Sequence, residues 1–164
     1  MPPPNTTSAT PGPSPTTGGG GFVGGGEGGD FQDLYLIFIE DPIAFNASTV
    51  GPAGDATFDT RLFLFRIDGR GVLYSDDASA TDDRSVLKGG KSIPGRGVYG
   101  LAISGTPSIP QTAGASPMFP FAPPGESVGP TDEGVGAPLA GWNPETNATG
   151  SYLLSLSGVD FIPL

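Results

Sequence analysis

The sequence predicts an all-β fold in which antiparallel strands form a sandwich or a barrel, and we favour the sandwich. Short runs of β-branched and aromatic residues alternate with polar residues along much of the chain. No segment keeps a helical period of 3.6 residues, and glycine and proline interrupt each candidate helix. We therefore expect about six to eight short strands joined by Gly/Pro turns.

Residues 1–30 consist mostly of Pro, Gly, Ser and Thr, and they offer little beyond Phe22 and Val23 to bury. Ordering such a segment costs about 1–2 kcal/mol per residue, with no apolar burial in return. We predict a disordered linker here, a Pro/Thr-rich stalk followed by glycines, or a disordered end without a role. Residues 31–164 are then the folded domain.

The first predicted strand is residues 31–41, FQDLYLIFIED, which is apolar on both faces and rich in Tyr, Ile and Phe. Pro42 ends it, because proline cannot donate to a sheet ladder. Residues 44–49 alternate in polarity and form a second short strand, and residues 51–55, GPAGD, have the composition of a turn.

Residues 58–68, FDTRLFLFRID, give the strongest strand signal in the chain. Asp-Gly within residues 68–71 predicts a hairpin turn, and residues 72–77 return as the partner strand. The two faces of the first strand carry different residues: Leu62 and Leu64 on one side, and Phe63, Phe65 and Ile67 on the other.

Three further strands are predicted at residues 84–90, 97–105 and 150–159. One face of the strand at residues 97–105 has the small residues Val98, Gly100 and Ala102. This favours close approach by another strand or sheet on that face. The predicted core residues share an inward position on the best strands: Leu62, Leu64, Tyr99, Leu101, Ile103, Tyr152, Leu154 and Leu156.

Residues 105–150 form a long Pro/Gly-rich insertion before the last strand, with no clear strand of its own. A loop of this length without structure is uncommon in a compact domain. The insertion contains Phe119, Phe121 and the only tryptophan, Trp142. Either these aromatics bind a ligand, or they cap one edge of the sandwich. Exposure of Trp142 would favour binding, and its burial would favour the structural role.

Composition excludes several functions. The chain has no cysteine and no histidine, so it has no disulfide, Cys/His zinc site, Cys nucleophile or His base. A net charge of −10 argues against nucleic-acid binding through phosphates. The longest apolar run, LYLIFI, is too short for membrane insertion, and the N-terminus has no signal-peptide pattern.

Residues 74–84, YSDDASATDDR, contain the four candidate metal ligands Asp76, Asp77, Asp82 and Asp83. Calcium binds about six to eight oxygens on a tight loop, and these carboxylates could supply some of them. The spacing differs from that of an EF-hand, so a solvated turn is the alternative. Asp59 is predicted to cap a turn.

Catalysis has little support in the sequence, and we predict that the chain is not an enzyme. The aspartates lie in a loop of small residues, and the sequence gives no sign of an apolar pocket that would raise a pKa. No GxSxG motif occurs, and the glycines of GGGGFVGGGEGG lack the Lys-Ser/Thr of a P-loop.

Three segments resemble, in their order, the bacterial pre-peptidase C-terminal domain: FDTRLFLFRIDGRGVLYSDDAS, then GVYGLAISG, then a closing GSYLLSLSGV. APLAGW before the last strand is similar to the variant found in secreted proteins with exosortase (PEP-CTERM) sorting tails. The resemblance implies a jelly-roll-like β-sandwich outside the cytoplasm, and it aligns Asp76 and Asp77 with an Asp-Asp segment of that family. We expect the chain to differ from that family in having no attached enzyme and no sorting tail.

From these observations we expect a non-catalytic accessory or structural module of a secreted or cell-surface bacterial protein. The alternative is a module that binds calcium, or that binds an extracellular polysaccharide or protein partner. Metal ligands would then come from the aspartate loop, and ligand contacts from the aromatic insertion.

Overall fold

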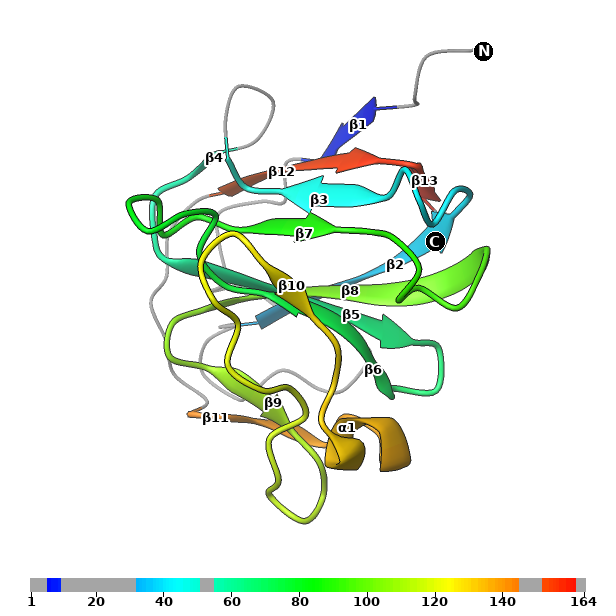
Figure 1. The fold of residues 1–164 in the computed structure, drawn as a ribbon, viewed down its shortest axis with the longest axis vertical. Helices are drawn as coiled ribbons and strands as arrows, with labels where there is room; N and C mark the ends of the chain where they lie inside the picture. The colour runs from blue at the N-terminus through cyan, green and yellow to red at the C-terminus, as the bar shows by residue number, and fades with distance from the viewer. Residues whose placement is uncertain (1–5, 10–31, 51–54, 145–151, 162–164) are drawn as a thin grey trace.

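The computed structural model describes residues 6–9, 32–50, 55–144 and 152–161, which form antiparallel strands and one short helix (Figure 1). The strands are β1 (Thr6–Ala9), β2 (Gln32–Ile39), β3 (Asn46–Ser48), β4 (Asp55–Ala56), β5 (Thr60–Arg66), β6 (Gly71–Ser75), β7 (Val86–Lys88), β8 (Gly97–Gly105), β9 (Ile109–Gln111), β10 (Ser127–Val128), β11 (Gly141–Asn143), β12 (Tyr152–Ser157) and β13 (Val159–Phe161). The helix α1 spans Asp132–Gly136, and no helix in the described ranges is long and apolar enough to cross a membrane. The prediction of a mostly β fold is confirmed.

The strands form three layers. One sheet has the order β1-β12-β3-β7, with β4 also paired to β12, and a six-stranded sheet has the order β10-β6-β5-β8-β2-β13. Figure 1 shows β12, β3 and β7 over one face of the six-stranded sheet, and β9, β11 and α1 beyond its other face. We call the face toward β12 the inner face and the other the outer face.

The inner face contributes to a hydrophobic cluster, the inner core, which includes residues of both large sheets. Leu64 and Leu101 of the six-stranded sheet meet Leu154 and Leu156 of β12 there, and all four are almost fully buried. All eight residues that the alternation predicted as core belong to this cluster. That prediction is confirmed, because strict alternation in β5, β8 and β12 places every second side chain on one face.

The β5–β6 hairpin has the predicted Asp-Gly turn. The Asp68 carboxylate accepts from the Arg70 amide at 3.0 Å, and Gly69 has φ of 91°, which favours glycine. Ile67 does not continue the face of Phe63 and Phe65 as predicted. It lies in the turn and is exposed, because β5 ends at Arg66 and the chain reverses there.

Two segments differ from the sequence expectation. The predicted last strand is two strands: β12 joins the five-stranded sheet, and β13 joins β2 in the other sheet after a change of direction at Gly158. Inside the predicted linker, Thr6–Ala9 form β1 and pair with the edge of β12, which has unpaired backbone groups to offer. The predicted turn at 51–55, and the rest of residues 1–30, lie almost wholly outside the described residues.

The insertion has structure of its own, so the prediction that residues 105–150 lack strands is wrong for its described part. It contains β9, β10, α1 and β11, and β9 pairs with β11 while β10 pairs with β6. Its apolar residues Met118, Phe119, Ala122 and Leu139 cover the outer face and form the outer core with Phe63, Phe65, Tyr74 and Ala102. The insertion is therefore a third layer.

Candidate functional site

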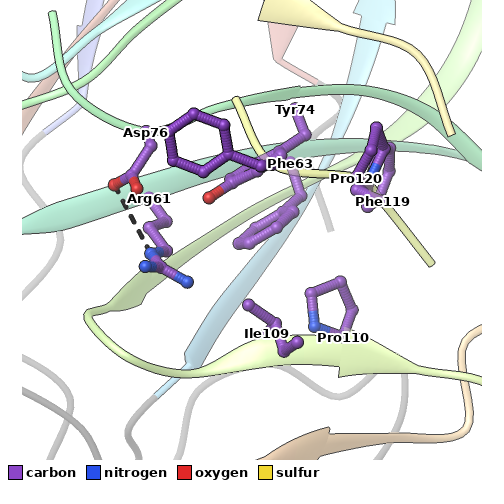
Figure 2. A pocket seen from close by; sticks show the side chains of 9 residues that line it. Arg61, Phe63, Tyr74, Asp76, Ile109, Pro110, Phe119 and Pro120 are labelled. Atoms are coloured by element: carbon purple, nitrogen blue, oxygen red, sulfur yellow. Dashed lines mark ion pairs between the residues drawn. The ribbon is translucent and has the colours of Figure 1, made fainter. Parts of the chain in front are cut away.

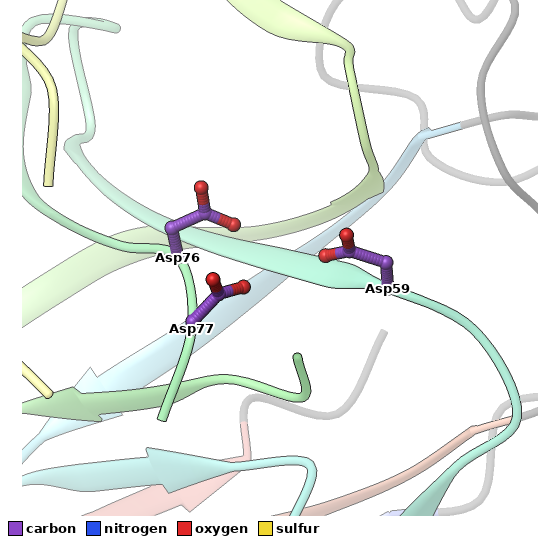
Figure 3. Close-up of side chains that lie close together, drawn as sticks. All are labelled: Asp59, Asp76 and Asp77. Carbon is purple, nitrogen blue, oxygen red and sulfur yellow. The ribbon is translucent and has the colours of Figure 1, made fainter. Parts of the chain in front are cut away.

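Three aspartates meet at the open end of the β5–β6 hairpin. Leu62 pairs with Ser75, so the residues before Leu62 and after Ser75 lie opposite one another. One carboxylate oxygen from each of Asp59, Asp76 and Asp77 lies within 4.8 Å of the others, and all three residues are partly buried (Figure 3). We call this group the acidic triad.

Buried hydroxyls fix the backbone beside the acidic triad. The hydroxyls of Thr49 and Thr60 are 2.9 Å apart, and Thr60 donates to Ser85 at 3.0 Å. The Ser85 amide in turn donates to the Thr49 hydroxyl at 2.9 Å. Buried polar groups that are fully hydrogen-bonded rigidify a structure. Since Thr60 follows Asp59, this network holds one end of the triad in place.

Asp76 has an unusual electrostatic environment. Its Oδ1 lies 3.4 Å from Nε of Arg61, and both side chains are mostly buried. Burial raises the pKa of Asp76 to about 6; the Arg61 charge opposes the increase, and the charges of Asp77 and Asp59 add to it. Burial also raises the pKa of Asp59, and Asp77 and Asp83 contribute repulsion. A proton or a bound cation would relieve this repulsion.

The other two predicted ligands lie apart from this group. Asp82 forms a bidentate pair with Arg84, with Nε–Oδ1 and Nη2–Oδ2 distances of 2.9 Å. Hydrogen bonds from the Arg84 side chain lower the pKa of Asp82. Asp83 is exposed and is not one of the three residues in the triad. The structure thus unites Asp76 and Asp77 with Asp59, which the sequence analysis had interpreted as a turn cap.

A usable signal for Asp59 was present in the sequence. Counting residues outward from the Asp68-Gly69 turn along both strands brings residue 59 close to residues 76 and 77. A register count of this kind needs only the turn position and the pairing rule of an antiparallel hairpin. Proximity along the sequence instead favours Asp82 and Asp83 as the partners of Asp76 and Asp77.

The three predicted ligand-contacting aromatics have different positions. Phe119 is buried in the outer core, with its ring centroid 5.7 Å from those of Phe63 and Tyr74. Trp142 is half-buried and packs edge-on against Phe63, with the centroids 5.4 Å apart. Phe121 is 78% exposed. Two of the three rings therefore pack in the outer core, and one faces solvent.

A cavity of about 190 Å³ lies on the outer face, between β5, β6 and the insertion. Arg61 and Asp76 border one end of it, and Figure 2 shows Phe63, Tyr74 and Phe119 around it, with Ile109 and Pro110 on the opposite side. Phe121 also lines the cavity. Asp76 is thus shared between the acidic triad and the cavity.

Comparison with protein-family models, with characterised proteins and with solved structures finds no match. The chemistry of the site follows from its side chains. Carboxylates held within 4.8 Å of one another suit a hard cation, with Arg61 as the competing counterion for Asp76. The neighbouring cavity adds aromatic surface to one donor and one acceptor side chain.

Proposed function

We propose that the chain is a non-catalytic accessory or structural module of a secreted or cell-surface bacterial protein, with a jelly-roll-like β-sandwich fold. The packing of the insertion is the observation that carries this proposal. Phe119 and Trp142 contact Phe63 in the outer core instead of presenting their faces to solvent. Residues that a ligand-binding loop would expose thus stabilise a third layer.

The order of sequence motifs supports the same proposal. The Asp-Thr start of β5, the apolar hairpin, the Asp-Asp segment after β6 and the Gly-x-Tyr start of β8 follow the pattern of pre-peptidase C-terminal domains. Those domains are accessory modules of secreted proteins. A net charge of −10 suits a soluble module that is displayed in water.

Protease treatment of intact cells that make the protein, combined with fractionation, tests the proposed location. We expect the chain in the culture supernatant, or on the cell surface where added protease removes it. A cytosolic enzyme measured in the same samples is the control for lysis. Detection of the chain solely in the protease-resistant cytosolic fraction would contradict the proposal.

A second candidate function is calcium binding by Asp59, Asp76 and Asp77. A calcium ion contacts oxygens at about 2.3–2.6 Å, so two ligand oxygens can be up to about 5 Å apart. The 4.8 Å limit within the acidic triad meets this condition. Backbone carbonyls and water would complete the shell, and calcium would replace Arg61 as the counterion of Asp76.

Thermal unfolding with calcium, magnesium or sodium chloride at matched ionic strength tests the calcium site. Millimolar calcium should stabilise the protein, because the ion binds the folded state. The gain is about 2.7 kcal/mol when free calcium is in hundredfold excess over Kd. Asp77→Asn should abolish the increase, whereas Asp82→Asn, in the same loop but paired with Arg84, should retain it. Equal shifts from all three salts would show screening instead of binding.

A further inference from the structure

The cavity on the outer face carries a pair of polar atoms that the fold leaves without partners. Nε of Arg61 faces Oδ1 of Asp76 at 3.4 Å, and Nη1 of Arg61 donates to the Pro107 carbonyl at 3.5 Å. Among the described residues, the buried Nε of Arg61 and Oδ1 of Asp76 have no hydrogen-bond partner, although the Asp76 carboxylate also shares a hydrogen bond with the Tyr74 side chain. Both side chains line the cavity and are about 85% buried, with exposed fractions of 16% and 15%. A donor and an acceptor thus stand side by side at one end of it.

This pairing selects the chemistry of an occupant. A hydroxyl can accept from Arg61 and donate to Asp76 at the same time, and neighbouring hydroxyls on a ring can divide the two roles. An ammonium group only donates, and a carboxylate or phosphate only accepts, so either would leave one of the two groups unpaired. An unpaired buried polar group costs about 1–3 kcal/mol.

Charge points in the same direction. Asp76 is joined by Asp59 and Asp77, so three carboxylates stand against the single guanidinium of Arg61. The chain as a whole carries a net charge of −10. An anionic ligand would meet repulsion at this end of the cavity, which favours a neutral one.

The volume of the cavity and its aromatic lining limit the size and kind of the occupant. The volume of about 190 Å³ is below the roughly 300–1,000 Å³ of typical small-molecule sites, so the cavity holds one ring and not an oligomer. Phe63, Tyr74 and Phe119 line its wall. Phe121 stands at this cavity with 78% of its surface exposed, an aromatic face that the fold itself does not cover.

We propose that this cavity binds one ring of a neutral sugar, whose hydroxyls bridge Arg61 and Asp76 while its C–H face packs on Phe121. The site goes beyond the proposed accessory role, and it does not require calcium in the acidic triad. It gives an extracellular module a means of contacting the terminal or exposed residue of a polysaccharide.

The test is an amide NMR titration of the full chain in EDTA with the methyl glycosides of glucose, galactose and mannose. We expect at least one of them to give saturable shifts at Arg61 and Phe121, with a Kd in the millimolar range. Phe121→Ala should weaken this binding at least tenfold without loss of folding, because the ring is exposed. Ile43→Ala removes another exposed apolar side chain, 69% exposed and absent from the cavity lining, and should leave the binding unchanged.

Several results would overturn the sugar site. They are the absence of saturable shifts with all three glycosides, equal affinity in Phe121→Ala, and stronger binding of glucuronate or acetamide than of the neutral sugars. Stronger acetamide binding would indicate a peptide ligand instead. None of these results bears on the accessory role, which the fractionation experiment tests separately.

Discussion

The two faces of the six-stranded sheet are covered in different ways, although the same strands build both. Leu62 and Leu64 of β5 face a second sheet, whereas Phe63 and Phe65 face the irregular insertion. The inner core is mainly aliphatic, whereas half of the residues of the outer core are aromatic. Two pleated sheets interdigitate small branched side chains, but an irregular cover leaves uneven gaps that large flat rings fill.

The covers also differ in how they are attached. The strands of the sheet over the inner face pair with one another in backbone ladders. The insertion is tied to the six-stranded sheet by the short β10–β6 pairing and by single bonds, such as the Leu139 amide to the Gly69 carbonyl at 2.9 Å. A second such bond joins Gly125 to the Asp77 carbonyl at 2.8 Å. We infer that the outer layer depends more heavily on side-chain packing.

The largest effects should come from truncating neighbouring core residues on opposite faces. Leu64→Ala should lower the free energy of unfolding by about 2–5 kcal/mol, and Phe63→Ala by about 3–5 kcal/mol, because each leaves a cavity in a closely packed cluster. Urea unfolding of both variants measures this. If the outer layer is a true core, the two losses are similar.

A loss of under about 0.5 kcal/mol for Phe63→Ala, alongside a full loss for Leu64→Ala, would contradict the inference that the outer layer is a true core. The insertion would then be a cover that contributes nothing to global stability. Exposed Ile67, which follows the same strand in the turn, gives a control: Ile67→Ala should stay within about 0.5 kcal/mol of the parent.

Two glycines of α1 test the packing of the outer layer alone. A Cβ on Gly134 would lie 2.1 Å from the Met118 carbonyl oxygen, whereas one on Gly136 would meet nothing within 4 Å. Gly134→Ala should therefore destabilise the protein by about 1–3 kcal/mol through overpacking. Gly136→Ala should be neutral or slightly stabilising, because alanine is the better helix former. Equal melting temperatures for the two variants would contradict the close fit of α1 on Met118.

The inner core was predictable and the outer core was not, for a physical reason. Leu62, Leu64 and Leu154 lie on strands long enough to show a period of two. The strands β9, β10 and β11 have only two or three residues, which is too short for any period, and Pro110 finds its partner Trp142 far along the chain. The aromatic residues of the insertion were compatible with ligand binding or with capping of the sandwich, and the sequence does not show which face they would cover.

The candidate site shows the same division. Asp76 and Asp77 are the last two residues of a strand that the sequence predicted, so their position at the hairpin end could be inferred. Asp59 required the register, and Asp82 required the local pairing with Arg84, which depends on how the loop closes. The exposure of Phe121 and burial of Phe119 depend on tertiary packing alone.

A buried carboxylate with a raised pKa lies on each face of the six-stranded sheet. The dependence of stability on pH therefore reports on both faces. Asp33, on the inner side, accepts from the Tyr152 hydroxyl at 2.5 Å, and burial raises its pKa although this hydrogen bond opposes the increase. Burial raises the pKa of Asp76, on the outer side, to about 6. In both cases the folded state holds the proton more tightly than the unfolded state. The stability that each of these two protonated carboxyl groups contributes is therefore fully present below about pH 4. It is lost as the pH rises through the folded-state pKa of the group.

We expect the free energy of unfolding in EDTA to fall between pH 4 and pH 7, with Asp76 accounting for about 1–3 kcal/mol at about 1.4 kcal/mol per pKa unit. Asp76→Asn should flatten the curve between about pH 4 and pH 6, and Asp33→Asn should remove a separate part. The lowered pKa values of Asp68 and Asp82 act in the opposite direction, but below this window. A stability that rises from pH 4 to pH 7 would contradict both assignments.

The smallest effect concerns the outermost strand of the layer on the inner face. β1 pairs with β12 over four residues, from Thr6 to Ala9. Backbone hydrogen bonds contribute a net ~0.5–1.5 kcal/mol each, and ordering a residue costs ~1–2 kcal/mol, so the two nearly cancel over so short a strand. Removal of residues 1–30 should therefore leave cooperative thermal melting and change the free energy of unfolding by less than about 1 kcal/mol.

Two proline variants of the full chain, Thr7→Pro and Ser8→Pro, test the pairing of β1 alone. Amide donors alternate along an edge strand, so one of the two variants must lose a hydrogen bond of the ladder. Melting that loses cooperativity on truncation would show that residues 1–30 belong to the fold, and a matching loss in one proline variant would place that contribution in β1.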